Sequence, residues 1–177
     1  DVYKRQLSIR KEGNTLAWGA VYEQYFQEID KVKGQKGVLS VEKKLFVETN
    51  NGTNRQIRPV TPEQPLRIGD KVIVRLTIRT DREMNYVFLK DLRAGCFEPA
   101  DQLSGPESRD GIWYYRSPKD VSENFFINRL PEGAFVLEYP VYVSRSGEYA
   151  GGISTIQCMY APEFVSHTAG ESLRIMP

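Results

Sequence analysis

The chain has 177 residues, and its 24 Lys and Arg nearly balance 23 Asp and Glu, which gives a formal net charge of +1. This balance excludes the strongly basic surface of a nucleic-acid-binding protein. The chain also lacks an apolar run of about 18 residues, which is the length that a membrane-spanning helix needs. We expect no nucleic-acid partner and no direct membrane span. The length fits one β-sandwich plus a short extra segment, with a core that folds without disulfides.

The first residues are not a natural start. Residues 1–6 begin without Met and resemble translated sequencing adapter. We treat 1–6 as a sequencing artefact and expect the natural chain to continue upstream. Farther along, residues 33–38 are polar and hold two glycines, a composition that predicts a linker.

The segment between these two parts, residues 7–32, is ambiguous from its residues alone. Trp18, Tyr22, Tyr25 and Ile29 recur at helical spacing, whereas the alternation of Trp18 and Tyr22 also suits a strand. The pattern leaves both alternatives open.

Four strands are expected in the first half of the main domain. Residues 39–47 alternate apolar and polar side chains, as a half-buried strand does. Asn and Gly at 50–53 predict a hairpin turn, and residues 55–60 form the returning strand. The clearest alternation covers residues 72–78, and residues 85–92 are expected as its hairpin partner.

Further strands follow after a long loop at residues 101–111. They recur about every 8–12 residues with turns between them, which is typical of an antiparallel sandwich. The fold predicted for residues 39–177 is all-β, an antiparallel β-sandwich. Its remaining strands are expected at residues 113–116, 124–130, 135–143, 153–160 and 172–176.

Several short motifs occur in a fixed order. They are Asp91-Leu92-Arg93-Ala94-Gly95-Cys96-Phe97-Glu98-Pro99, Leu130-Pro131-Glu132-Gly133, Met159-Tyr160-Ala161-Pro162-Glu163-Phe164 and a glycine, Gly170, before the last strand. This succession resembles the C-terminal macroglobulin domain of bacterial alpha-2-macroglobulins. The resemblance implies that residues 39–177 are that domain, an antiparallel immunoglobulin-like β-sandwich of macroglobulin type. It also implies that 7–32 are the tail of the preceding domain, made of β-strands and extended to about Gln24.

The resemblance also implies a function. The parent protein would be an endopeptidase inhibitor, a protease trap of the cell envelope, and this domain would be a structural part without catalysis. Its partners would be other domains of the same parent chain, especially the thioester-type domain, and target proteases would be met through the parent. The parent would be exported to the periplasm or cell surface and anchored through an N-terminal region absent from this chain. Met159 and Tyr160 would pack between the sheets, and Gly95 and Gly133 would adopt positive φ at turns.

The residues give little reason to expect an active site. Cys96 and Cys158 lie in apolar surroundings and are expected as buried thiols, although one disulfide is an alternative. Neither begins the Cys-x-Glu-Gln stretch from which the family's thioester is built. His167 lies in a polar stretch read as a surface loop, and a thiol hydrolase would need a cysteine within hydrogen-bond reach of it. We expect no catalytic residue, no cofactor and no metal site.

Five carboxylates in loops could form a calcium site or a glycosidase pair. The spacing of a calcium-binding loop is absent, and the sequence does not give the distance between carboxylates that a glycosidase requires. We expect solvated loop charges at Glu98, Asp101, Glu107, Asp110 and Asp120.

A second function remains open. In a stand-alone adhesion or carbohydrate-binding sandwich of an envelope protein, Trp113, Tyr114 and Tyr115 would form an aromatic platform. The exposure of Trp113 distinguishes the two hypotheses, because platform rings face solvent and core rings do not.

Overall fold

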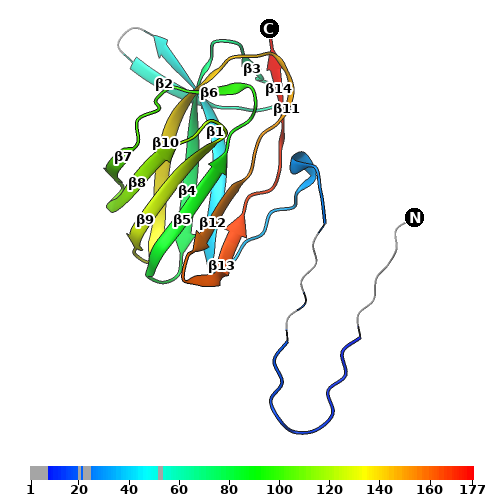
Figure 1. Ribbon diagram of the computed structural model, residues 1–177. Helices are drawn as coiled ribbons and strands as arrows, with labels where there is room; N and C mark the ends of the chain where they lie inside the picture. The colour runs from blue at the N-terminus through cyan, green and yellow to red at the C-terminus, as the bar shows by residue number, and fades with distance from the viewer. Residues whose placement is uncertain (1–7, 20, 22–24, 52–53) are drawn as a thin grey trace, which may run out of the picture.

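The computed structural model describes residues 8–19, 21, 25–51 and 54–177. The strands form two larger sheets and one small one (Figure 1). The five-stranded sheet has the order β2-β1-β4-β10-β6, the six-stranded sheet β13-β12-β5-β9-β8-β7, and the small sheet β11-β14-β3. The bounds are β1 Leu39–Asn51, β2 Asn54–Pro59, β3 Leu66–Arg67, β4 Lys71–Thr80, β5 Met84–Leu92, β6 Phe97–Pro99, β7 Gly105–Arg109, β8 Ile112–Pro118, β9 Ser122–Leu130, β10 Gly133–Val143, β11 Gly147–Ala150, β12 Ser154–Cys158, β13 Ala161–His167 and β14 Ser172–Met176.

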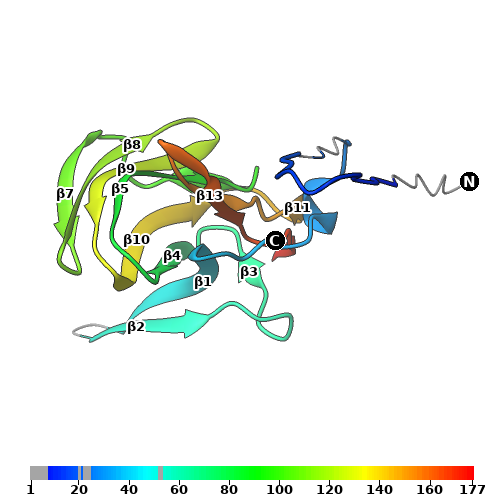
Figure 2. The ribbon, with the colours of Figure 1, turned by 90° about the horizontal axis from the view of Figure 1, so that it is seen from below.

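The two larger sheets lie face to face as two layers (Figure 2). The alternation along each strand explains why. In β4, Val72, Val74, Leu76 and Ile78 are buried against the other sheet, whereas Arg75 lies on the outer face. Burying one such side chain contributes about 1.5–3 kcal/mol, so the facing apolar rows hold the layers together.

The all-β prediction is confirmed, since the described residues form an antiparallel β-sandwich. One short pair, β3 with β14, is parallel. The prediction that residues 85–92 are the hairpin partner of 72–78 is wrong. β4 pairs with β1 and β10, and β5 pairs with β9 and β12 in the opposite sheet. The turn between them crosses from one layer to the other.

Two loop expectations also need correction. The stretch 101–111 is not all loop, because β7 lies within it and pairs with β8. Gly133 has φ of 140°, as expected of a turn glycine. Gly95 is absent from the positive-φ residues of the described chain, so the corner there does not depend on left-handed backbone.

The N-terminal segment projects away from the sandwich (Figure 1). In the described part of this segment, the only regular element is one 3₁₀ turn, η1 (Ile29–Lys31). The apolar side chains that precede the turn, Trp18, Tyr25 and Phe26, are exposed. A strand needs a partner strand, and the described chain places none beside this segment. Residues 1–6 lie outside the described residues, as do Ala20 and 22–24. The tail of a preceding domain stays a prediction.

Within the described ranges, no helix is long and apolar enough to cross a bilayer.

Candidate functional site

The space between the sheets holds a buried carboxylate, Asp91, on the inner face of β5. It is fully buried and accepts hydrogen bonds from Ser154 Oγ at 2.7 Å, from Lys43 Nζ at 2.8 Å and from the Tyr139 hydroxyl. Burial, together with the negative charge of Asp91, raises the pKa of Tyr139 well above its ordinary value. Asp91 is therefore bonded on both oxygens by three different strands.

Lys43 connects this carboxylate to the neighbouring backbone. Its ammonium comes from β1, in the opposite sheet, and also donates to Leu92 O at 3.0 Å and Gly151 O at 3.3 Å. A buried ammonium is tolerated only when paired and hydrogen-bonded, and these three oxygens supply that. The lysine thus joins the two sheets through one side chain.

A second buried carboxylate, Glu123 on β9, lies beside two guanidinium groups. Arg116 Nε donates to it at 2.7 Å and Arg93 Nη2 at 3.1 Å. Burial raises the pKa of Glu123, against the opposing effect of both arginines. Glu123 and Asp91 are inaccessible to solvent, so no substrate can reach them, and their arrangement is structural.

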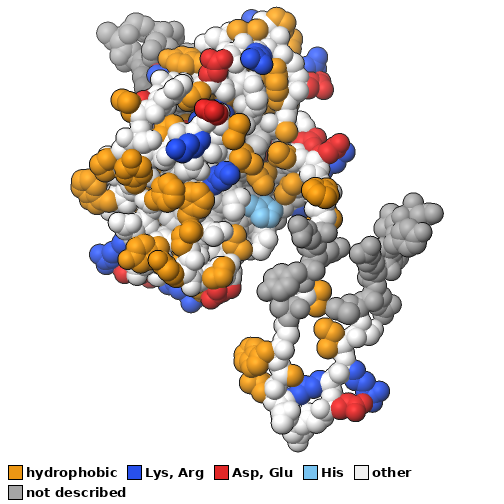
Figure 3. Space-filling model, in the orientation of Figure 1, with side chains coloured by type: hydrophobic (Ala, Val, Ile, Leu, Met, Phe, Trp, Pro, Cys, Tyr) orange, Lys and Arg blue, Asp and Glu red, His pale blue; other side chains and the backbone are white. Residues whose placement is uncertain are grey.

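The outer face of the same sheet carries aromatic rings. Cross-strand register places Phe88 of β5 opposite Phe126 of β9, and Phe126 opposite Tyr115 of β8. Tyr115 in turn lies opposite Pro106 of β7. Hydrophobic side chains gather on this face of the molecule in Figure 3. We call the set made by Tyr86, Phe88, Trp113, Tyr115, Phe126 and Tyr160 the aromatic face.

Four rings of the aromatic face pack in two pairs, and the face as a whole still meets solvent. Phe88 and Phe126 stack with centroids 4.9 Å apart, and Tyr86 meets Tyr160 edge to face at 5.2 Å. Trp113 is 71% exposed. A contiguous exposed apolar patch of this kind usually marks a contact surface. This face is the candidate functional site.

The expectation that Met159 and Tyr160 pack between the sheets is wrong. Both are exposed, Tyr160 by 82%, because β12 ends at Cys158 and the next two residues form the turn to β13. Ile156 and Cys158 point inward, but the strand ends two residues before Tyr160, so the alternation does not bring Tyr160 inside.

The aromatic platform expected for the second hypothesis is partly present. Trp113 and Tyr115 face solvent, while Tyr114 between them is buried, donates to Glu107 Oε2 at 3.0 Å and so belongs to the core. By the criterion set out above, the exposure of Trp113 therefore favours the second hypothesis, an adhesion or carbohydrate-binding surface, although Tyr114 is missing from the platform.

The thiol and imidazole groups are dispersed. Cys96 and Cys158 are buried and unpaired, which confirms the buried-thiol prediction. Burial raises the pKa of the Cys96 thiol to about 11, and Cys158 Sγ donates to Asn85 O at 3.3 Å. His167 lies at the end of β13 and is half-buried, not in a surface loop, with Nδ1 3.1 Å from Thr168 O. Among the described residues, neither thiol is hydrogen-bonded to that ring.

Two of the predicted loop carboxylates, Asp101 and Glu107, lie beside one arginine. Four of the five are exposed, but Glu107 is half-buried and lies 3.5 Å from Arg116. Asp101 lies 3.7 Å from the same guanidinium, and Asp110 accepts from Val136 N at 3.0 Å. Across the described ranges, no three His, Cys, Asp or Glu side chains lie where they could hold a metal ion.

Comparison with protein families decides what kind of domain this is. Residues 39–163 match the family described as the bacterial alpha-2-macroglobulin MG10 domain. The chain belongs to this MG10 family. The match begins where β1 begins, and it includes most of the strands of both larger sheets.

Solved structures agree on the fold of this MG10 domain. Salmonella alpha-2-macroglobulin reacted with methylamine superposes with a TM-score of 0.64 at 21% identity, over 82% of this chain and 10% of that one. Escherichia coli alpha-2-macroglobulin spanning MG7 to the C-terminus gives 0.62 at 16% identity, over 81% and 24%. The MG10 chain thus spans a tenth to a quarter of the proteins it matches.

One curated protein with another description also matches part of the sequence. The MG10 chain is 28% identical over 109 residues to "Circularly permutated Ras protein 2" of Dictyostelium discoideum. That match covers 62% of this chain and only 3% of the relative.

Proposed function

We propose that this MG10 domain is a non-catalytic structural module of a longer bacterial alpha-2-macroglobulin, and that it docks onto another domain of the same chain through the aromatic face. The carrying observation is the row of rings Phe88, Phe126 and Tyr115 on the outer face of the six-stranded sheet. Since the two sheets already bury their own core, these rings serve no packing role inside the sandwich. A second apolar surface would remove them from water at about 25 cal/mol per Å².

The parent protein in this proposal is an endopeptidase inhibitor that traps proteases. Solved relatives of the same fold include Escherichia coli forms activated by trypsin and by porcine elastase, which supports a link to proteolysis. The parent would be exported to the periplasm or cell surface and anchored upstream of this chain. The thioester-type domain is the partner proposed for the aromatic face, and target proteases would meet the parent instead of this domain.

A mechanical role suits the interior of the domain. Lys43 of one sheet bonds Asp91 of the other, so the layers are joined by an ion pair as well as by the core. A domain with two firmly joined sheets moves as one body when its neighbours rearrange. We propose that it relays the conformational change of the trap in this way.

The test uses the full-length parent carrying Tyr115→Ser and Phe126→Ser. We expect retention of trypsin, measured on native gels, to fall at least tenfold, because the rings no longer hold the partner domain. In the 177-residue chain the same pair should change the melting temperature by only a few degrees, since both side chains are nearly half exposed.

A matched control comes from the other sheet. Tyr142 on β10 is 45% exposed and Phe126 46%, so Tyr142→Ser removes a comparable ring from the opposite outer face. It should leave trapping unchanged. Full trapping by the Tyr115 and Phe126 variant, with the domain folded, would contradict the proposal.

A carbohydrate-binding sandwich is the second candidate, favoured by the exposure of Trp113 beside Tyr115. Sugars stack on such rings, so the 177-residue chain would be retained on an insoluble polysaccharide and Trp113→Ala would abolish retention. The docking proposal predicts no retention for either chain.

A further inference from the structure

The predicted linker is attached to the sandwich. Gln35 N donates to His167 O at 2.9 Å and His167 N returns the bond to Gln35 O at 3.0 Å, an isolated antiparallel bridge at the end of β13. Gly170 N donates to Val32 O at 2.8 Å. Residues 29–38 therefore lie along residues 167–172, and we call this stretch of 29–38 the joint.

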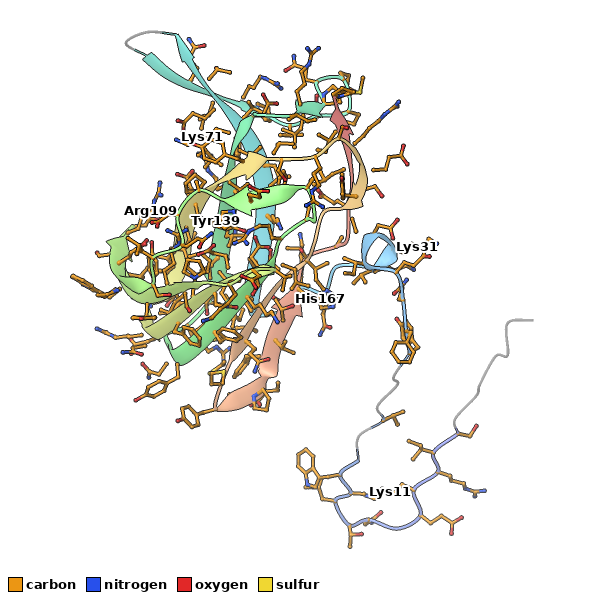
Figure 4. All side chains as sticks on the ribbon, turned by 45° about the horizontal axis from the view of Figure 1, so that its top comes forward. Lys11, Lys31, Lys71, Arg109, Tyr139 and His167 are labelled. Carbon is orange, nitrogen blue, oxygen red and sulfur yellow. The ribbon has the colours of Figure 1, made fainter. Side chains whose placement is uncertain are left out.

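Figure 4 places His167 where the joint meets the sandwich, with Lys31 at the 3₁₀ turn close by. A side-chain contact extends the attachment, since Ser172 Oγ lies 3.4 Å from Asp30 Oδ2. Backbone and side-chain bonds thus occur at several points along the joint, not at one end only.

Gly170 is shaped by this contact. A Cβ at position 170 would lie 1.7 Å from Ile29 O and 2.9 Å from the carbonyl carbon of Asp30, closer than any side chain can approach backbone. Gly170 is absent from the residues with positive φ, so its backbone conformation alone does not require glycine. The glycine before the last strand is needed because the joint passes over it.

A second glycine has the complementary role. A Cβ at Gly34, within the joint, would lie 3.0 Å from Ala169 N. The backbone of the joint and the backbone before β14 thus lie close together, and each has a glycine at the contact. The glycines at residues 33–38, from which a linker was predicted, permit this close contact between main chains.

We propose that residues 29–38 form a fixed joint, seated by Gly170, which holds whatever precedes residue 29 at a set orientation to the sandwich. A movement of the preceding part would then be transmitted to the sandwich directly. This last consequence rests on the proposed function, whereas the joint itself is a property of this chain.

The joint predicts slow exchange of specific amides in the 177-residue chain. Hydrogen exchange followed by NMR should show the Gln35, His167 and Gly170 amides protected at least tenfold relative to peptide rates, because each is a donor in the contact. Gly170→Ala should abolish that protection while amides of β4 exchange as before. The matched control is Gly105→Ala, because no heavy atom lies within 4 Å of a Cβ there.

Orientation is tested by a distance distribution. Spin labels at Lys33→Cys and Arg79→Cys, both exposed, should give a narrow distribution in the otherwise unchanged chain and a broad one with Gly170→Ala. The native thiols are buried, so labelling is confined to the new sites.

Several outcomes would overturn the proposal. Unprotected Gln35 and Gly170 amides in the unaltered chain would do so, as would a broad distance distribution in it. Unchanged protection and width with Gly170→Ala would contradict the role of that glycine. If Gly170→Ala does not fold, Gly34→Ala replaces it and should raise the exchange rates by a smaller factor. None of these measurements involves a protease or a partner domain, so a negative result leaves the docking proposal intact.

Discussion

The inner and outer faces of the six-stranded sheet come from the same strands, β5, β8 and β9, and each face carries groups that are unusual there. The inner face is mostly apolar, but it also carries the ionic groups Asp91, Arg116 and Glu123, all buried. The outer face carries Phe88, Phe126 and Trp113 in contact with solvent. Ordinary sandwiches place apolar residues inside and polar residues outside.

The difference separates groups whose bonding partners lie within this domain from rings for which we propose a partner domain. Every carboxylate on the inner face has its partners within this chain, so burial is compensated. On the outer face, Phe88 stacks on Phe126 and Tyr86 meets Tyr160, while the rings remain in contact with solvent. The buried carboxylates are thus satisfied within the chain, whereas the outer rings form the surface that we propose docks onto a partner domain.

The largest effect is expected at the buried ion pair. Asp91→Asn leaves the Lys43 ammonium without its countercharge, and the Lys43 side chain is only 11% exposed. Breaking a buried pair in this way costs about 3–5 kcal/mol, so the free energy of unfolding in urea should fall by that amount.

The same position offers its own control. Adding Lys43→Met to Asp91→Asn removes the unpaired charge and should recover part of the loss. A double variant as unstable as the sum of both single changes would show that the two groups act independently.

A neighbouring pair of rings compares the two faces directly. Phe125 and Phe126 are adjacent in β9, but Phe125 is 1% exposed and lies inside. Phe125→Ala should lower the free energy of unfolding by about 3–5 kcal/mol, and Phe126→Ala by about 1 kcal/mol through the lost stack with Phe88. Chemical denaturation of both variants measures the difference, and equal losses would mean that the outer rings belong to the core.

A smaller effect is expected in alkaline solution. Burial raises the pKa of the Cys96 thiol from 9.0 to about 11, so between these values the unfolded chain has released a proton that the folded chain keeps. The unfolded state then binds fewer protons, and the free energy of unfolding falls as the pH rises. Urea unfolding at pH 8 and pH 10 should show a larger fall in the natural chain than in Cys96→Ala. Identical falls would mean that Cys96 titrates freely.

Much of the architecture was predictable because alternation reports which side of a strand is buried. Residues 72–78 and 135–143 show it, and both are strands with one face in the core. Alternation does not report which strand lies next to which, and for this reason β5 was paired with β4 incorrectly. Pairing depends on how both layers close over a common core.

The candidate site depends on that same missing information. Trp113 and Tyr115 were visible as a possible surface, but Phe88 and Phe126 join them only through the register of β5, β9 and β8. Lys43 interrupts the apolar alternation of its strand, and that break alone does not indicate what the lysine pairs with. Its partner Asp91 lies 48 positions away, and no local pattern connects them.

The order of strands also has a consequence during protein synthesis. β5 pairs on one edge with β12, and Leu89 meets Ile156 roughly 70 residues later in the chain. A ribosome adds about 5–20 residues per second, so this edge of β5 waits several seconds for its neighbour. During that wait the nascent strand presents open backbone groups together with Tyr86 and Phe88, which is the kind of segment that chaperones bind.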